Sequence, residues 1–259
     1  MKAFLLVLMI FLSSNISLFG QIYLKSESTH YIGYSLGAGQ IKEENLIPKT
    51  HKGLSHFLSY QFEFRNDVYR CFEFIIGFGR YKTKIENEAL SFNVQLLLSY
   101  LYNFKIFENE YIDYYLGLKT GFASSLSEYE NWDEAHAYWG NYLSLGPSNT
   151  VNISLDENNY LLMHLDLALL GIYTRPDYNR LYANEHWTFS NIINKMNSNY
   201  HFGFVNNAFQ AKVSVEYRTP IFNDDHLSLM FSFYYSRLQA DSGKPLKEFF
   251  IKFGIGIWL

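Results

Sequence analysis

The stretch "SFNVQLLLSYLYNFK", residues 91–105, separates into two chemically different sets when every second residue is read. One set is large and apolar: Phe92, Val94, Leu96, Leu98, Tyr100, Tyr102 and Phe104. The other set is mostly polar and includes two leucines: Ser91, Asn93, Gln95, Leu97, Ser99, Leu101, Asn103 and Lys105. Successive side chains of a β-strand point to opposite faces, so this period of two predicts a strand with one oily face and one polar face.

The same alternation recurs along the chain and, with the first stretch, predicts ten strands. The other nine cover residues 30–39, 54–65, 69–81, 111–122, 142–156, 161–169, 209–218, 227–236 and 249–258. Short connections alternate with long ones, which fall at residues 40–53, 82–90, 123–141, 174–207 and 238–247. Short turns at one end and long loops at the other are the layout of an all-β, up-and-down, antiparallel transmembrane β-barrel, with short periplasmic turns and long extracellular loops.

The N-terminus has the character of a targeting segment. Residues 1–20 are expected to be a secretory signal peptide, because Lys2 precedes an apolar run that is too short to cross a bilayer as a helix. Residues 21–259 are expected to form a single barrel domain, since no internal repeat or domain linker interrupts them. The net charge of −4 gives no electrostatic reason to expect nucleic acid as a partner. Cys71 is the only cysteine, which excludes a disulfide framework within the chain.

The architecture depends on which face of each strand meets lipid. Bulky Leu, Phe and Tyr side chains need no packing partner in lipid, whereas the repeated Gly and Ser of the polar faces suit a narrow interior. Hydrocarbon also demands that every backbone group be paired, and a closed barrel achieves this. We therefore expect the oily faces to point outward and the polar faces inward. A soluble lipocalin-like barrel, with the faces reversed, is the alternative.

The chain ends in "FFIKFGIGIWL", an aromatic and strand-like terminus. Together with the signal peptide and the alternating segments, this ending makes residues 28–259 resemble the small outer-membrane β-barrel proteins of Gram-negative bacteria. The resemblance implies a multi-pass location in the outer membrane, contact with outer-membrane lipid, and insertion by the barrel-assembly machinery. The sequence departs from the family pattern at its end, because Leu259 follows Trp258 where such proteins usually end in Phe or Trp.

The inward-facing positions carry acidic and basic residues in equal number. The acids are Glu63, Glu73, Asp113, Asp166 and Glu216, and the bases are Arg65, Lys119, Lys212, Arg218 and Lys252. Charges in a narrow lumen are costly unless they are paired, and ten strands enclose little more than side chains can fill. We therefore predict a lumen closed by an ion-pair network. A small polar conduit that acts as a passive channel is the alternative.

Three tryptophans fall in the two longest expected loops, 123–141 and 174–207: Trp132, Trp139 and Trp187. Exposed aromatic side chains favour recognition, so these loops are expected to bind a surface protein, a glycan or a lipid. Carboxylates around Asp133 offer oxygen ligands for calcium, but the pattern favours a solvated loop face over a calcium site. We expect neither a metal site nor a cofactor.

The best enzymatic candidates are Ser190 and His186, a hydroxyl and a base in the longest loop. Their spacing differs from that of the outer-membrane deacylases, and the surrounding apolar pattern favours a short amphipathic helix on the barrel rim. The stretch "NDDH", residues 223–226, is similar to the Asp/His pairs of omptin-type proteases but falls on a short turn. The sequence leaves enzyme activity open and favours a structural or binding module, with a surface hydrolase of lipid or peptide as an alternative.

Overall fold

The computed structural model describes residues 28–44, 49–65, 67–83, 88–104, 111–129, 136–175, 200–222, 225–239 and 243–259. They form strands joined by turns. The strands are β1 (Ser28–Glu43), β2 (His51–Phe64), β3 (Val68–Lys82), β4 (Glu88–Asn103), β5 (Ile112–Tyr129), β6 (His136–Ser154), β7 (Tyr160–Ala168), β8 (Leu170–Thr174), β9 (Tyr200–Phe204), β10 (Ala208–Phe222), β11 (Asp225–Leu238) and β12 (Leu246–Trp258). The expected signal peptide at residues 1–20 lies outside the described residues.

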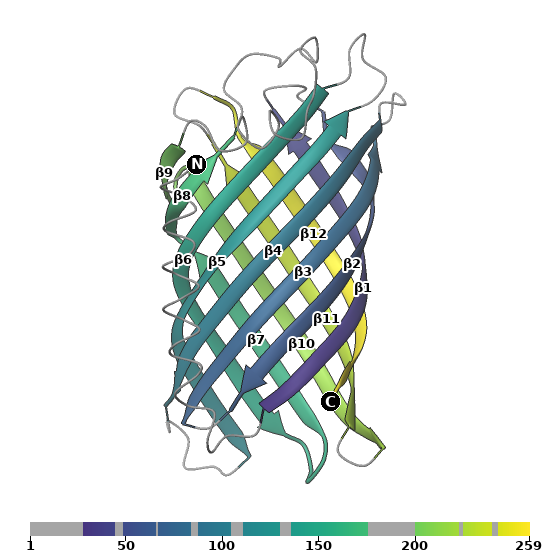
Figure 1. Ribbon diagram of the computed structural model, residues 1–259, viewed down its shortest axis with the longest axis vertical. Coiled ribbons are helices and arrows are strands. Elements are labelled where there is room, and N and C mark those ends of the chain that lie inside the picture. Colours follow the sequence, from purple (N-terminus) through teal and green to yellow (C-terminus); the bar gives the residue numbers. More distant parts are fainter. Residues whose placement is uncertain are drawn as a thin grey trace.

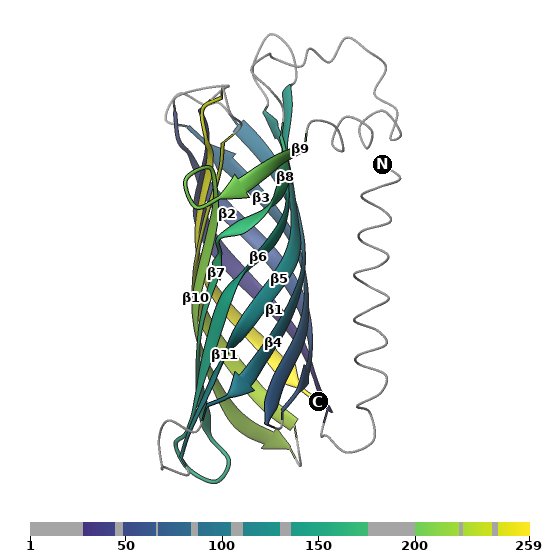
Figure 2. The same ribbon diagram turned by 90° about the vertical axis from the view of Figure 1, so that its left-hand side faces the viewer.

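The twelve strands make a barrel of ten wall strands. β6 pairs with β7 along one part of its edge and with β8 along another, so β7 and β8 together form one wall strand. β9 pairs with β8 and β10 pairs with β7, so β9 and β10 form the next one (Figure 2). Every neighbouring pair is antiparallel, and the pairing of β1 with β12 closes the barrel (Figure 1). The predicted ten-stranded up-and-down barrel is confirmed.

The register determines the tilt of the strands. A line perpendicular to the strands that leaves β1 at Tyr34 reaches Ser124 on β5 by way of β2, β3 and β4. The same line drawn the other way, through β12, β11, β10, β7 and β6, reaches Ile112 on β5. The two arrival points lie 12 residues apart, which is the shear of the barrel. Ten strands with this shear tilt by about 40° from the barrel axis, and the steep slant is visible in Figure 1.

The oily faces of the strands point outward, as predicted. Leu58 is 62% exposed, Phe253 is 64% exposed and Phe92, from the opening stretch, is 46% exposed. The inward faces carry small, aromatic and charged residues, most of which are buried. In the described part of the chain, no helix is long and apolar enough to cross a membrane. The exposed apolar side chains form a band around the exterior. Contact with acyl chains is favourable for this band, whereas contact with water is not.

The strands run further at the long-loop end than the sequence indicated. The expected loop over residues 123–141 is mostly strand, because the pairing of β5 with β6 continues to Tyr129 opposite His136. β1 likewise extends to Glu43, within the loop expected at residues 40–53. The small polar residues in these segments obscured the strand pattern, yet backbone pairing continued because every second residue still faces the interior.

Candidate functional site in the ion-paired lumen

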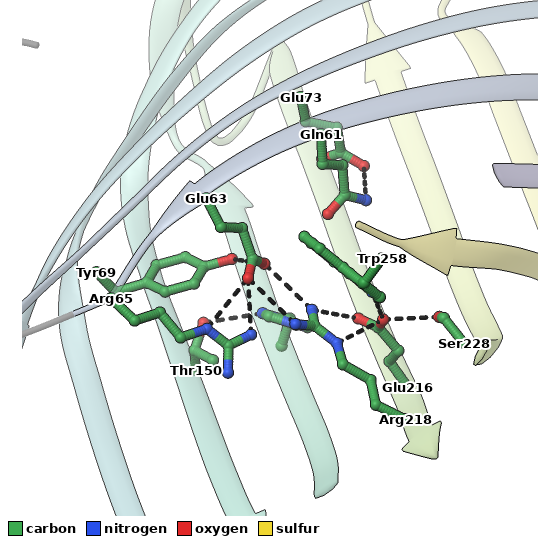
Figure 3. Close-up of polar contacts among 11 residues, drawn as sticks. Gln61, Glu63, Arg65, Tyr69, Glu73, Thr150, Glu216, Arg218, Ser228 and Trp258 are labelled. Atoms are coloured by element: carbon green, nitrogen blue, oxygen red, sulfur yellow. Dashed lines mark hydrogen bonds and ion pairs between the residues drawn. The ribbon is translucent and has the colours of Figure 1, made fainter. Parts of the chain in front are cut away.

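The first group of lumen charges lies near the short-turn end and is centred on Arg218 of β10. Its guanidinium donates to Glu216 through Nε at 2.8 Å and Nη2 at 3.0 Å. It also donates to Glu63 of β2 through Nη1 and Nη2, both at 3.2 Å (Figure 3). The guanidinium carbon lies 3.6 Å from the centre of the Trp258 ring. One cation is thus held by two carboxylates and one aromatic face in a buried position.

Each carboxylate in this group has further donors. Glu63 accepts from Arg65 Nη2 at 2.8 Å and from the Tyr69 hydroxyl at 2.7 Å. Glu216 accepts from Ser228 Oγ and from the Trp258 indole nitrogen, both at 2.7 Å. We call Glu63, Arg65, Glu216 and Arg218 the Arg218 cluster. Its two acids and two bases balance, as burial of charge requires.

A second balanced group occupies the middle of the barrel. Lys119 of β5 contacts Asp166 of β7 at 2.7 Å and Glu73 of β3 at 3.4 Å. Lys212 of β10 contacts Glu73 at 2.9 Å. Ser148 Oγ donates to Asp166 at 2.6 Å. We call the four charged residues of this group the Lys119 cluster: Lys119, Asp166, Glu73 and Lys212. They connect four strands across the lumen.

Eight of the ten predicted charges therefore meet in these two clusters, and two do not. Asp113 accepts from Asn103 Nδ2 at 3.2 Å. Lys252 places its ammonium nitrogen 3.7 Å from the centre of the Phe57 ring. Within the described residues, neither Asp113 nor Lys252 has an ion-pair partner. Four of the five predicted acids and four of the five predicted bases form ion pairs. The predicted set omits three further buried charges: Glu43, Glu248 and Arg175.

An aromatic layer lies on the long-loop side of the Lys119 cluster. The Phe250 ring packs against Phe57 at 5.9 Å and against Tyr234 at 6.0 Å between ring centres. Small residues make room for these rings: a Cβ on Gly77 would lie 2.6 Å from Phe57, and one on Gly37 would lie 2.8 Å from it. Gly77 and Gly37 therefore accommodate aromatic rings inside the barrel, as expected for glycines on the polar faces of the strands.

The sequence missed a further ion pair near the long-loop end. Arg175 donates through Nη2 to Glu43 at 2.7 Å, and also to the carbonyl of Leu238. Both side chains are buried, 1% exposed for Arg175 and 2% for Glu43. The sequence pattern places both residues in expected long loops, at 40–53 and 174–207. Tyr31 faces inward, and Glu43 follows it at an even number of residues along the same strand. The alternation of period two could therefore have predicted an inward position for Glu43.

The lumen contains separate hollows. Two near the Lys119 cluster measure about 40 Å³ and about 30 Å³ and share Lys119, Asp166 and Lys212 in their walls. Each has room for only a few water molecules. A larger hollow of about 220 Å³ lies at the short-turn end, where it is lined by Thr29, Arg65, Tyr160, Arg218, His226 and Trp258. Two members of the Arg218 cluster, Arg65 and Arg218, thus line this vestibule.

Most of the candidate residues in the predicted long loops lie outside the part of the chain that the structure describes. Trp132, Trp187, Ser190 and His186 lie outside the described residues. Trp139 is a strand residue of β6 and only 5% exposed, because the β5–β6 pairing continues past it. Of "NDDH", Asn223 and Asp224 lie outside the described residues, and His226 lines the vestibule at the short-turn end. No group of His, Cys, Asp and Glu residues suited to a metal occurs in the portion of the chain that the structure covers.

Comparison with known proteins identifies the fold. The structure is similar to the outer membrane protease OmpT from Escherichia coli, with a TM-score of 0.51 and 8% identity over 92% of this chain and 98% of that one. It also matches the attachment invasion locus protein Ail of Yersinia pestis, with a TM-score of 0.39 and 12% identity over 90% of this chain and 99% of Ail. No protein family and no curated protein matches the sequence. The closed wall of ten strands, the apolar exterior and the polar interior together define a small outer-membrane β-barrel.

Proposed function

We propose that this protein is a closed outer-membrane barrel, a non-conducting module that supports structure or binding at the cell surface. The observation that carries the proposal is the occupied lumen. The Arg218 cluster, the Lys119 cluster and the aromatic layer follow one another along the barrel axis. Their charged members are held by contacts across the lumen, such as Arg218 with Glu63 and Lys212 with Glu73.

An open diffusion pore would need these contacts to be broken. Lys119 bridges β3, β5 and β7 through Glu73 and Asp166, so that one displaced ammonium would leave two buried carboxylates short of a partner. Loss of one partner from a buried ion pair costs about 3–5 kcal/mol. Thermal motion therefore opens such a lumen only rarely.

Conductance of the reconstituted protein tests the closed lumen. The wild-type protein, refolded into planar bilayers, is expected to show no discrete current steps. Protection of the barrel from added trypsin, measured on the same preparation, establishes that the protein has inserted. Current steps from the wild type would overturn the proposal. A matched variant, F57A/F250A/Y234A, removes the aromatic rings and leaves both charged clusters, so steps from this variant alone would locate the main block in the aromatic layer.

The surface role is supported by the length of two strands. A tilted strand needs about 9–11 residues to cross the hydrocarbon region, whereas β5 has 18 residues and β6 has 19. Their pairing continues to Tyr129 opposite His136. The extra length forms a paired hairpin wall beyond the bilayer, and a rigid wall loses little conformational entropy on binding.

Shortening this hairpin tests the surface role. A variant that joins Ser125 to Gly140 through Asn-Gly keeps the pairs nearer the membrane and removes the projecting part. Biotinylated protein in nanodiscs is then applied to a glycan array and to cross-linking in native outer membranes. The full-length protein is expected to give a reproducible glycan or protein signal that the shortened variant loses. A signal of equal strength from both variants, or none from the full-length protein, would contradict a binding role for this hairpin.

A further inference from the structure

A row of cations follows the outer face of the barrel at its long-loop end. The strand register places Arg237 opposite Lys247, Lys247 opposite Lys42, and Lys52 opposite Lys82. Gln40, opposite Lys52, connects the two halves of this row on β1. Arg80 lies two residues from Lys82 on the same outward face of β3. We call these six cations the basic row: Arg237, Lys247, Lys42, Lys52, Lys82 and Arg80.

The row is only partly neutralised by the protein itself. Glu44 contacts Lys247 at 2.8 Å and Lys42 at 3.2 Å. Glu88 contacts Lys82 at 2.5 Å and also pairs with Arg80. Six cations thus face two carboxylates within the described residues of this surface. Like charges directly opposite one another on a sheet are destabilising, so an unneutralised row of this kind favours an external anion.

The cations are accessible and are concentrated on one side of the barrel. The side chains of Arg80 and Lys82 are 61% and 58% exposed, and that of Lys247 is 38% exposed. They belong to β11, β12, β1, β2 and β3, which are consecutive in the wall. On the other half, the described outward residues at the same end of β4, β5 and β8 include Leu90, Leu126 and Leu170 and no lysine or arginine. A general attraction to an anionic surface would not need this one-sided arrangement.

The apolar band begins directly below the basic row on the same faces. Phe78 and Ile76 follow Arg80 on β3, Leu54 follows Lys52 on β2, and Ile251 lies below Lys247 on β12. Phe78 is 52% exposed and Leu54 is 53% exposed. A soluble anion would use the cations alone, whereas a phosphorylated lipid would use both the cations and the apolar faces beneath them.

We propose that the basic row binds the phosphate headgroup of a lipid in the outer leaflet, with the acyl chains lying along β11, β12, β1, β2 and β3. Lysine and arginine stems reach past the apolar band to the headgroup level, as they do at other membrane interfaces. The site does not involve the lumen, so its test is independent of whether the barrel conducts.

Native mass spectrometry of the detergent-solubilised protein measures the binding. The probe is a diphosphorylated glucosamine-disaccharide lipid (lipid A), and its dephosphorylated form is the matched ligand control. The wild type is expected to bind the phosphorylated probe preferentially. Each cation removed should weaken binding roughly fivefold, so K52Q/K82Q should bind about thirtyfold more weakly. E88Q should bind more tightly than the wild type, because Arg80 and Lys82 lose their internal partner.

Net charge is controlled by adding a reversal at the short-turn end of the barrel. Glu157 is an exposed residue of the turn between β6 and β7, and K52Q/K82Q/E157K restores the wild-type net charge without restoring the row. This variant should remain as weak as K52Q/K82Q. The proposal would be overturned by full recovery of lipid binding in this variant, by unchanged binding in K52Q/K82Q, or by equal binding of the dephosphorylated probe. Displacement of the lipid by inorganic phosphate at equal concentration would show a free-phosphate site and would overturn it as well.

Discussion

Arg218 lies with its guanidinium carbon 3.6 Å from the centre of the Trp258 ring, and both residues donate hydrogen bonds to the same oxygen of Glu216. Trp258 is the penultimate residue of the chain, and Arg218 lies on β10, two strands away in the wall. The aromatic C-terminal strand therefore contributes directly to the inner wall of the vestibule. The same strand, β12, pairs with β1 to close the barrel and places Trp258 against the charged residues of the lumen.

Removal of the Arg218 charge should destabilise the barrel strongly. Arg218→Met leaves the buried carboxylates of Glu63 and Glu216 without their shared cation, so the free energy of unfolding should fall by about 3–5 kcal/mol. Urea unfolding of protein refolded in lipid vesicles measures this change. Arg65→Met is the matched control and should cost less, because Arg65 is 26% exposed and Glu63 keeps Arg218 and Tyr69. Equal losses in both variants would contradict the central position of Arg218.

Lys252 and Lys119 should respond in opposite ways to the same substitution. Lys252→Met removes a buried cation that has no ion-pair partner among the described residues, so the unfolding free energy should stay constant or rise by roughly 1 kcal/mol. The lost cation–π contact with Phe57 limits the gain. Lys119→Met leaves Asp166 and Glu73 undercompensated and should lower the unfolding free energy by about 3 kcal/mol. A larger loss for Lys252→Met than for Lys119→Met would show that Lys252 is paired after all.

Gly77 and Phe57 should show strong energetic coupling. Gly77→Ala places a Cβ about 2.6 Å from the Phe57 ring, which must then shift within a packed layer. The expected loss in unfolding free energy is about 1–3 kcal/mol, as for other overpacked interiors. In a Phe57→Leu background the same substitution should cost much less, because the shorter side chain does not reach Gly77. A double-mutant cycle by urea unfolding measures the coupling, and additive effects would contradict the contact.

The turn between β6 and β7 should make the free energy of unfolding depend on pH in the acidic range. The backbone amide of Asn158 donates to Asp156 at 3.0 Å, and this hydrogen bond, followed by those from Asn159, holds the pKa of the Asp156 carboxyl below its usual range. Because the folded pKa is depressed, this stabilisation is present above the unfolded pKa of about 3.9 and is lost as the pH falls through the folded value.

Asp156→Asn isolates this contribution. The difference in unfolding free energy between wild type and variant should shrink as the pH is lowered below about 4. Glu157→Gln, in the same exposed turn, serves as the control and should follow the wild-type pH profile. Parallel profiles of the wild type and Asp156→Asn would show that the hydrogen bonds of this turn do not stabilise the folded protein.

The sequence alone determined the strand type, the number of wall strands and the face of each strand that meets lipid. These properties are local, because a period of two assigns Phe92 and Asn93 to opposite faces without knowledge of any other strand. The inward charges followed from the same period. The ends of β1, β5 and β6 were less well predicted, since small polar residues weaken the contrast between the two faces.

Only the tertiary structure decided which inward charges meet. Glu63 and Arg218 are separated by 155 residues, and Arg175 and Glu43 by 132, so their contacts depend on closure and on the shear of 12. A different shear would place the same residues on the same faces but at other heights, with other partners. Alternation along one strand carries no information about this offset, which is why the sequence predicted an inward position for these charges and only the structure determined their pairing.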